Sequence, residues 1–320
     1  MQSLRWTALL LTAVSLQALA QAWPTQPIRL IVPFPPGGTS DQIARHVQPH
    51  LQQSLGTQIL IENRAGASGA IGTAATAKSP PDGNTYVLVF DTHGVNPSLI
   101  PNMGFDTLKD LAPVMLIAKS PMVVTAHPTT PYKTWGDVIA AARAKPEAVG
   151  YGSIGSGSLA HLAITQISGQ LGVRMTHVPY KGGGPLTTDA LAGHVPVAMA
   201  TAALFMPHIQ GGKLRALAVT SPKRTAQLPE VPTIAEQGVP GFEAEAWWGL
   251  LTSAKTPAPI VARMNAEFAK ALRQPAVNEK LVAQGFDLRY SSPDELGKFV
   301  ALEVERWGKV VRDNKITAGQ

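Results

Sequence analysis

The stretch Ile31-Val-Pro-Phe-Pro-Pro-Gly-Gly-Thr-Ser-Asp41 decides the fold, because it joins a buried strand to a helix through a glycine-rich turn. The short apolar run over residues 28–32, bounded by prolines, predicts the strand. Apolar side chains recur every four residues over 39–55 and predict the helix. The two glycines let the backbone approach a ligand closely. Unpaired N–H groups at such a helix start, together with the helix dipole, favour an anion.

A second unit of the same kind lies over residues 149–171, with the turn Gly150-Tyr-Gly-Ser-Ile-Gly-Ser-Gly-Ser-Leu-Ala-His161. This turn offers three serine hydroxyls beside a helix start. Either turn alone is compatible with a simple connection between a strand and a helix. Because a chain of 320 residues predicts two domains, two such turns at equivalent places favour a small carboxylate held from both sides of a cleft.

Composition excludes several other classes of protein. Hydrophobic residues make up 45% of the chain, which excludes wholesale disorder, and charged residues only 15%, against about 25% in typical soluble domains. The absence of cysteine excludes a disulfide scaffold, a Cys₂His₂ zinc site and a cysteine nucleophile. The net charge of +6 is scattered rather than gathered with aromatics, so no nucleic-acid partner is expected.

The first 22 residues have the features of an export signal. Arg5 is followed by an uncharged, mostly apolar run over residues 6–20, and Ala20-Gln21-Ala22 fits the small-x-small cleavage rule. We expect cleavage after Ala22 and a periplasmic mature chain. The run is short for a membrane anchor, and no later stretch has 18 consecutive apolar residues, so the mature chain is not expected to be embedded in the membrane.

Strand and helix patterns alternate along the chain, which predicts α/β layers. Pro49 is expected to kink the first helix or to end its first half. Strands are predicted over 28–32, 58–62, 86–90, 114–118, 122–126, 175–179 and 214–220, and helices over 39–55, 70–78, 135–144, from 188 onward, 260–272 and 293–311.

Two motifs resemble a dinucleotide site and a zinc site, but each lacks an acidic residue that the site needs. The glycines at 150, 152 and 155 match the dinucleotide fingerprint, but the next strand carries no acidic residue for a ribose. His46 and His50 have the spacing of a helical zinc site, but Val47 stands where the site needs glutamate. We therefore expect no cofactor and no metal.

A series of short motifs then runs along the chain in order: Pro27-Ile-Arg-Leu-Ile-Val-Pro-Phe34 with Gly37, Gly38 and Asp41; Glu62-Asn-Arg64 with Gly66 and Gly69; Pro81-Asp-Gly83; Asn96-Pro97; Tyr151-Gly-Ser153; His161-Leu162; Val178-Pro-Tyr-Lys-Gly182; Leu214-Arg-Ala-Leu-Ala-Val-Thr220; Leu228-Pro-Glu-Val-Pro-Thr233; Trp248-Gly249; and Arg306-Trp307. In number and order these motifs resemble those of the solute-binding receptors of tripartite tricarboxylate transport systems, the Bug proteins. The resemblance covers essentially the whole mature chain.

The resemblance implies a two-lobed periplasmic binding protein, a type II-like Venus flytrap in which each lobe is a mixed sheet flanked by helices. Residues 23–122 and 248–320 would form the first lobe and residues 123–247 the second. The family implies a monomer without enzymatic activity that holds a small organic carboxylate between the lobes and delivers it to membrane transporter subunits. The helices around Phe268 and Trp307 would pack on the first lobe.

The resemblance also implies a set of ligand-binding residues. The two glycine-rich turns would grip the ligand carboxylate, largely through backbone groups and water, and other segments would complete the cleft. The set comprises Phe34, Gly37, Gly38, Thr39, Ser40 and Asp41 from the first turn, Ser153, Ser156, Gly157, Ser158 and His161 from the second, and Asp91, Thr92, His93, Tyr180, Lys181, Gly182 and Thr201 from elsewhere.

Three of these residues have two interpretations each. Asp41 either stabilises the start of its helix or holds a ligand ammonium group, directly or through water. Lys181 either neutralises a ligand carboxylate or is solvated. His161 either orients the serine loop or is a buried structural histidine.

The chain departs from the family pattern at several positions. Ala65, Pro49 and Thr165 are unusual there, and residues 195–201 lack the usual aspartate and aromatic, which leaves a more apolar wall. The identity of the ligand therefore cannot be transferred from relatives.

Two alternatives to a transport receptor remain open from the sequence. Ser156 or Ser158 with His161 imitates part of a catalytic triad, which would suit an exported α/β serine hydrolase. Alternatively, the liganded protein reports to a membrane sensor instead of feeding a transporter.

Overall fold

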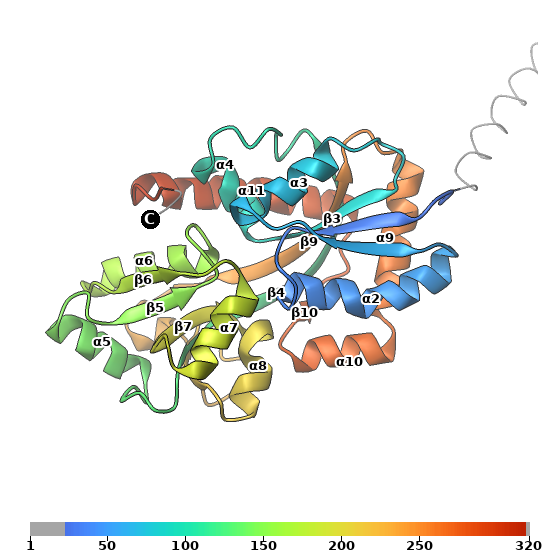
Figure 1. The fold of residues 1–320 in the computed structure, drawn as a ribbon. Coiled ribbons are helices and arrows are strands. Elements are labelled where there is room, and N and C mark those ends of the chain that lie inside the picture. Colours follow the sequence, from blue (N-terminus) through green and yellow to red (C-terminus); the bar gives the residue numbers. More distant parts are fainter. Residues whose placement is uncertain (1–22, 318–320) are drawn as a thin grey trace, which may run out of the picture.

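The computed structural model describes residues 23–317, so the predicted export signal of residues 1–22 lies outside the described part. The described strands form a mixed sheet that bends from one lobe into the other, in the order β2-β1-β3-β9-β4-β7-β5-β6, with β8 and β10 also paired to β4 (Figure 1). The architecture is the predicted two-lobed binding-protein fold.

The first lobe is built on three parallel strands, of which β1 and β3 are mostly apolar and β2, at the edge, ends in Glu62 and Asn63. β1 (Ile28–Val32) lies between β2 (Ile59–Asn63) and β3 (Thr85–Phe90). Runs of this kind suit a sheet that is covered on both faces. The covering helices are α2 (Thr39–Leu55), α3 (Ala70–Ala77), α4 (Thr92–Leu99), α9 (Ala258–Leu272), α10 (Pro275–Ala283) and α11 (Pro293–Asp313).

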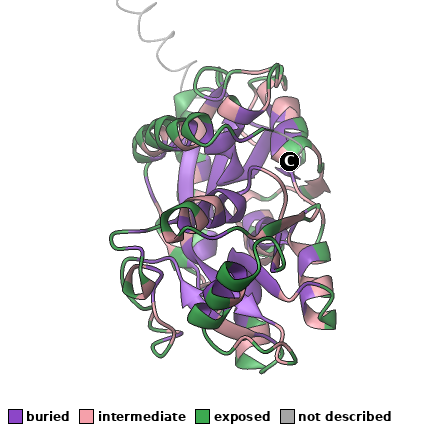
Figure 2. Ribbon diagram, turned by 90° about the vertical axis from the view of Figure 1, so that its left-hand side faces the viewer, coloured by how far each residue is buried: buried purple, intermediate pink, exposed green. Residues whose placement is uncertain are grey.

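The second lobe repeats this plan on a smaller scale. β5 (Gly150–Ser153) runs parallel to β6 (Thr176–Pro179) on one side and to β7 (Val197–Thr201) on the other. Its other elements are β8 (Arg215–Val219), α5 (Trp135–Ala144), α6 (Leu159–Leu171), α7 (Gly183–Ala192) and α8 (Ala202–Gln210). In Figure 2 the inner strands of both lobes are buried and the outer faces of the helices are exposed, whereas the edge strands β2 and β6 are only partly buried.

Two long antiparallel strands, β4 (Leu111–Ala126) and β9 (Glu245–Ser253), join the lobes. β4 pairs with β9 as far as Pro121, and from Met122 onward it pairs with β7 and β8. The sheet therefore changes lobes along a continuous backbone, and this change of partner lies beside the predicted lobe boundary at residue 122.

The prediction of two separate strands at 114–118 and 122–126 was wrong. The polar interruption between them stays in β4 because its groups find partners: Ser120 Oγ accepts a hydrogen bond from the Ala203 N–H at 3.2 Å, and Lys119 pairs with Glu245 at 3.8 Å. Pro49 does not end α2, which continues to Leu55, and α7 begins at Gly183, before the predicted start at residue 188.

The C-terminal helices pack on the first lobe, as expected. α9 contacts α2 and β4, and α11 contacts α4 and β4. Phe268 and Trp307 are buried on the inner faces of these helices. Among the described residues, none of the helices combines the length and the apolar character that crossing a membrane requires.

Candidate functional site

A cavity lies between the two lobes. The space inside it that could hold molecules the size of water is only about 30 Å³, so a ligand of several carbon atoms would enter only after the lobes open. Both lobes and the crossing strand β4 contribute to its wall. The lining residues are Phe34, Gly38, Thr39, Ser40 and Phe90 from the first lobe, Met122 from β4, and Ile154, Gly183, Ala200, Thr201 and Leu204 from the second lobe.

The start of α2 forms the polar part of this wall. We call residues 34–41 the first loop. Gly38 caps α2 with an extended backbone (φ −76°, ψ 169°) and supplies no side chain to the helix. The N–H groups of the first turn have no partners within a helix, so those of Thr39 and Ser40 have no protein acceptor from a cap. The Trp248 indole donates to Thr39 Oγ1 at 3.2 Å, which leaves the hydroxyl proton of Thr39 to donate elsewhere.

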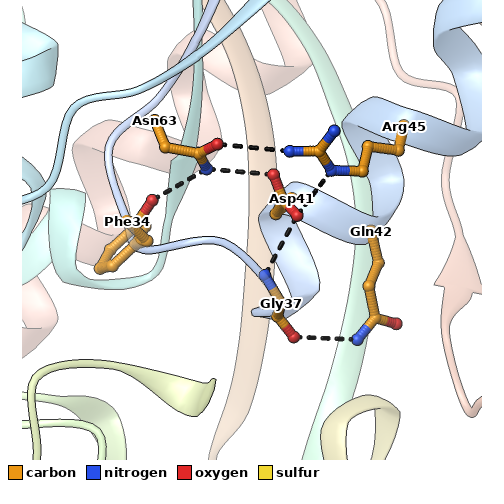
Figure 3. A network of polar contacts seen from close by, with 6 residues as sticks. All are labelled: Phe34, Gly37, Asp41, Gln42, Arg45 and Asn63. Atoms are coloured by element: carbon orange, nitrogen blue, oxygen red, sulfur yellow. Dashed lines mark hydrogen bonds and ion pairs between the residues drawn. The ribbon is translucent and has the colours of Figure 1, made fainter. Parts of the chain in front are cut away.

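The carboxylate of Asp41 contacts the backbone of the first loop and two neighbouring side chains, and so fixes the position of the loop (Figure 3). It accepts hydrogen bonds from the Gly37 N–H at 3.1 Å, the Asn63 amide at 3.0 Å and Arg45 Nε at 2.8 Å. The same Asn63 amide donates to the carbonyl of Phe34 at 3.1 Å. Burial opposes ionisation of Asp41, but these hydrogen bonds and the charge of Arg45 outweigh it and hold the pKa of Asp41 below its ordinary value. These contacts agree with the structural interpretation of Asp41, and its side chain does not line the cavity.

The start of α7 faces the first loop from the second lobe. Gly182 caps α7 with φ of +110° and, like Gly38, provides no side chain. A Cβ atom on Gly182 would lie 3.1 Å from Pro35 Cδ, and one on Gly184 would lie 3.3 Å from the carbonyl oxygen of Pro36. The lobes are therefore in contact across the cleft, and glycine is what permits this approach.

In the second loop, residues 153–161, the cap residue supplies an acceptor to its own helix. Ser158 caps α6, and its hydroxyl accepts from the His161 N–H at 3.4 Å and donates to Ser153 Oγ at 3.3 Å. The His161 ring accepts from the Gly157 N–H through Nδ1 at 3.1 Å. Of this loop only Ile154 lines the cavity.

Beneath the second loop, the ring of His161 stacks on that of His177 with centroids 4.0 Å apart. Ser153 Oγ lies 2.7 Å from His177 Nε2. Burial lowers the pKa of His161, which keeps its ring neutral and able to accept from Gly157. Gly157 also approaches α4 closely, since a Cβ atom on it would lie 2.1 Å from Leu99 Cδ1.

The segment Asp91 to His93 is buried inside the first lobe. Thr92 Oγ1 donates to the carbonyl of Ser68 at 2.9 Å, and the His93 ring stacks with that of Phe105. Burial, reinforced by the charge of Glu303, raises the pKa of Asp91, and burial lowers the pKa of His93 to about 4. The structure brings none of the three to the cavity wall, although the preceding residue, Phe90, reaches it.

The other predicted site residues divide into two groups. Thr201 lines the cavity, and its hydroxyl accepts from the Leu204 N–H at 3.2 Å. Tyr180 instead donates its hydroxyl proton to Asp189 at 2.9 Å, and Lys181 is exposed and does not line the cavity.

Of the apolar lining residues, sequence reasoning named only Phe34. Met122, Ala200 and Leu204 have the composition of ordinary core, and so do Phe90 and Ile154. The available signal was position: Phe90 ends β3, Ile154 follows β5, and Ala200 precedes the last residue of β7. Ligands in open α/β sheets bind beyond the carboxyl ends of the strands.

The hydrolase alternative that uses Ser158 gains no support from this geometry. Ser158 is 2% exposed, and its hydroxyl contacts Ser153 and the start of α6. Nδ1 of His161 contacts a backbone N–H group. Among residues 23–317, no cluster of three or more histidine, aspartate or glutamate side chains is arranged to hold a metal ion.

Comparisons with known families, sequences and structures all find solute-binding receptors. The family model described as tripartite tricarboxylate transporter family receptor matches residues 43–316. The chain is similar to the protein BugT of Bordetella pertussis, with 38% identity over 296 residues that cover 92% of this chain and 91% of BugT. Two solved structures are also similar. R. palustris Rpa4515 with adipate has 35% identity and a TM-score of 0.88, and the match covers 92% of this chain and 99% of that one. MatC from Rhodopseudomonas palustris with bound malate has 30% identity and a TM-score of 0.84, with coverage of 90% and 100%.

Proposed function

The chain belongs to the tripartite tricarboxylate transporter family of receptors, which are solute-binding proteins, and from this premise we propose that it binds a small organic carboxylate between its lobes in the periplasm and delivers it to a membrane transporter. One observation carries the proposal. The uncapped N-terminus of α2 opens onto a cavity between two lobes that contact each other. The ligands of two similar structures, adipate and malate, are carboxylates.

The ligand carboxylate would accept hydrogen bonds from the N–H and hydroxyl groups of Thr39 and Ser40. A helix N-terminus contributes only about 0.3–1 kcal/mol to anion binding, or about 2 kcal/mol when partly buried. Micromolar affinity needs about 8 kcal/mol. Most of the binding free energy must therefore come from apolar contact with the ligand body and from closure of the lobes.

Closure requires that the lobes move as units. We propose that residues 23–122 and 248–320 form one lobe and residues 123–247 the other, with the hinge where β4 leaves β9 to pair with β7 and β8. Phe34, Gly38, Thr39, Ser40 and Thr201 would contact the ligand, and the remaining predicted residues would hold these in place.

Calorimetry on the mature protein tests the binding step. We expect small carboxylates to bind and neutral sugars and amines of the same size not to bind. If sugars or amines bind and no carboxylate does, the proposal is wrong.

The output is tested separately. We expect the ligand-bound protein, added to membranes of its source organism, to retain transporter subunits in a pull-down. If a sensor is retained and no transporter subunit is, the output is signalling and not transport, and the proposal for the binding site still stands.

A further inference from the structure

The wall of the cavity carries no charged side chain. Among the described residues, none of those that line it is lysine, arginine, histidine, aspartate or glutamate. Its polar groups are the backbone and hydroxyls at the start of α2, the backbone of Gly183 and the hydroxyl of Thr201. The rest of the wall is the apolar side chains of Phe34, Phe90, Met122, Ile154, Ala200 and Leu204.

This division of the wall limits what the ligand carries at each end. One carboxylate finds donors at the start of α2. A second carboxylate on the same ligand would meet a wall without charged side chains and would lose its hydration without gaining a charged partner. A buried charge without a partner is strongly unfavourable, whereas a methyl group in the same place gains from its burial.

We propose that the cavity selects small monocarboxylates with an apolar body over dicarboxylates of the same chain length. The proposal rests on the proposed function, since it assumes that the start of α2 receives a carboxylate, and it adds the chemistry of the opposite end of the ligand.

Leu204 is the residue that maintains this selection. Besides lining the cavity, it lines a separate groove between α2, α7, α8 and α10. That groove carries the basic side chains His46, His208 and Lys280. Leu204 is 7% exposed and lies between the two spaces, so its side chain separates the apolar cavity from the ammonium group of Lys280. Burial lowers the pKa of His46 and of His208, which keeps both rings neutral at pH 7.5.

Matched pairs of ligands test the proposal directly. Hexanoate and adipate have the same number of carbons, as do butanoate and succinate, and differ only in whether the far end is methyl or carboxylate. By calorimetry at pH 7.5 we expect each monocarboxylate to bind at least about 30-fold more tightly than its partner, which corresponds to about 2 kcal/mol.

The outcomes distinguish this inference from the function on which it rests. If the dicarboxylate of each pair binds as tightly or more tightly, the inference is wrong and carboxylate binding stands. If no member of either pair binds and no other carboxylate does, both fail.

A variant of Leu204 gives a second, independent measurement. Leu204→Lys places an ammonium group in the uncharged wall, so we expect adipate affinity to rise at least about tenfold relative to hexanoate affinity. Leu204→Met is the matched control, because it changes shape without charge, and the order of preference should stay that of the wild type. An unchanged preference in folded Leu204→Lys protein would overturn the role given to Leu204.

Discussion

The two glycine-rich loops have similar sequences and different chemistry. Each follows a parallel strand and leads into a helix. In the first loop the cap residue is Gly38, no side chain caps α2, and Gly38, Thr39 and Ser40 line the cavity. In the second loop the cap residue is Ser158, whose hydroxyl accepts a hydrogen bond from one N–H group of α6. The ring of His161 accepts a hydrogen bond from the N–H group of Gly157, which precedes the helix.

This difference shows that a glycine-rich turn before a helix is not by itself an anion site. What matters is whether the protein has already filled the helix start with its own side chains. A filled cap stabilises the helix and removes the donors, whereas an empty cap keeps them for a ligand. In the cavity wall the nearest equivalent of the first loop is the start of α7 at Gly182 and Gly183, which is also uncapped.

The largest effect is expected from giving the first loop a cap of its own. Gly38 has an extended backbone, and a Cβ atom there would have Pro35 O as its nearest neighbour at 3.7 Å. The side chain of Gly38→Asp would therefore fit and accept the N–H groups that we assign to the ligand. We expect carboxylate affinity by calorimetry to fall about 100-fold, or about 2.7 kcal/mol.

The same variant should not lose stability, because aspartate is a better cap than glycine by about a few tenths of a kcal/mol. Gly38→Ala is the control: it adds a Cβ atom without an acceptor and should change affinity only a few-fold. Unchanged affinity in Gly38→Asp would mean that the start of α2 does not receive the ligand.

A smaller effect is expected from loosening the first loop. Asp41→Asn keeps the shape of the side chain but removes the charge that pairs with Arg45. We expect a lower melting temperature and carboxylate affinity about tenfold weaker, because the loop loses its fixed position. The pKa of Asp41 lies below its ordinary value, so this contribution to stability is present above about pH 4 and is lost as pH falls through the folded value.

Asp137 offers a matched control for Asp41. It occupies the same third position of its helix, α5, where it accepts from the backbone N–H groups of Lys133 and Thr134. Asp137 lies outside the cavity wall, so Asp137→Asn should leave affinity unchanged. Equal loss of affinity in both variants would assign the effect of Asp41→Asn to general destabilisation.

The reverse experiment applies to the second loop. Ser158→Ala removes the cap of α6, and we expect the free energy of unfolding in urea to fall by about 1 kcal/mol. Carboxylate affinity should change by no more than about threefold, because the hydroxyl already serves the helix. A large loss of affinity with little loss of stability would invert the comparison and make the second loop the ligand site.

Much of this architecture was predictable because its signals are local. The apolar period and the glycines of residues 28–55 predicted β1 and both bounds of α2. β4 was not predictable as one strand, because Lys119, Ser120 and Pro121 look like a break. The partners that keep them in the strand, among them Ala203 and Glu245, lie far away in the sequence.

The site was predictable only in part, for a related reason. The sequence placed Gly38, Thr39 and Ser40 beside a ligand, and these residues line the cavity. It did not reveal that the second loop would bond to itself, because the contact of His161 with Gly157 depends on the folded loop. Apolar lining residues such as Leu204 cannot be told from core residues without the three-dimensional arrangement.

The smallest expected effect is the response of the second loop to pH. Burial lowers the pKa of His161, so its neutral ring stabilises the fold fully above about pH 6.5, the ordinary value for histidine. As pH falls below that value, the unfolded chain takes up a proton more readily than the folded one, and stability is lost. Protonation also turns Nδ1 from an acceptor into a donor that faces the Gly157 N–H.

His161→Asn places an amide oxygen near the position of Nδ1 and does not titrate. Melting temperatures from pH 8 to pH 5 should therefore converge for the two proteins as pH falls, because only the wild type loses the contribution of His161. Parallel curves over this range would show that the second loop does not sense the charge of His161, and would leave the filled cap of α6 as a purely structural feature.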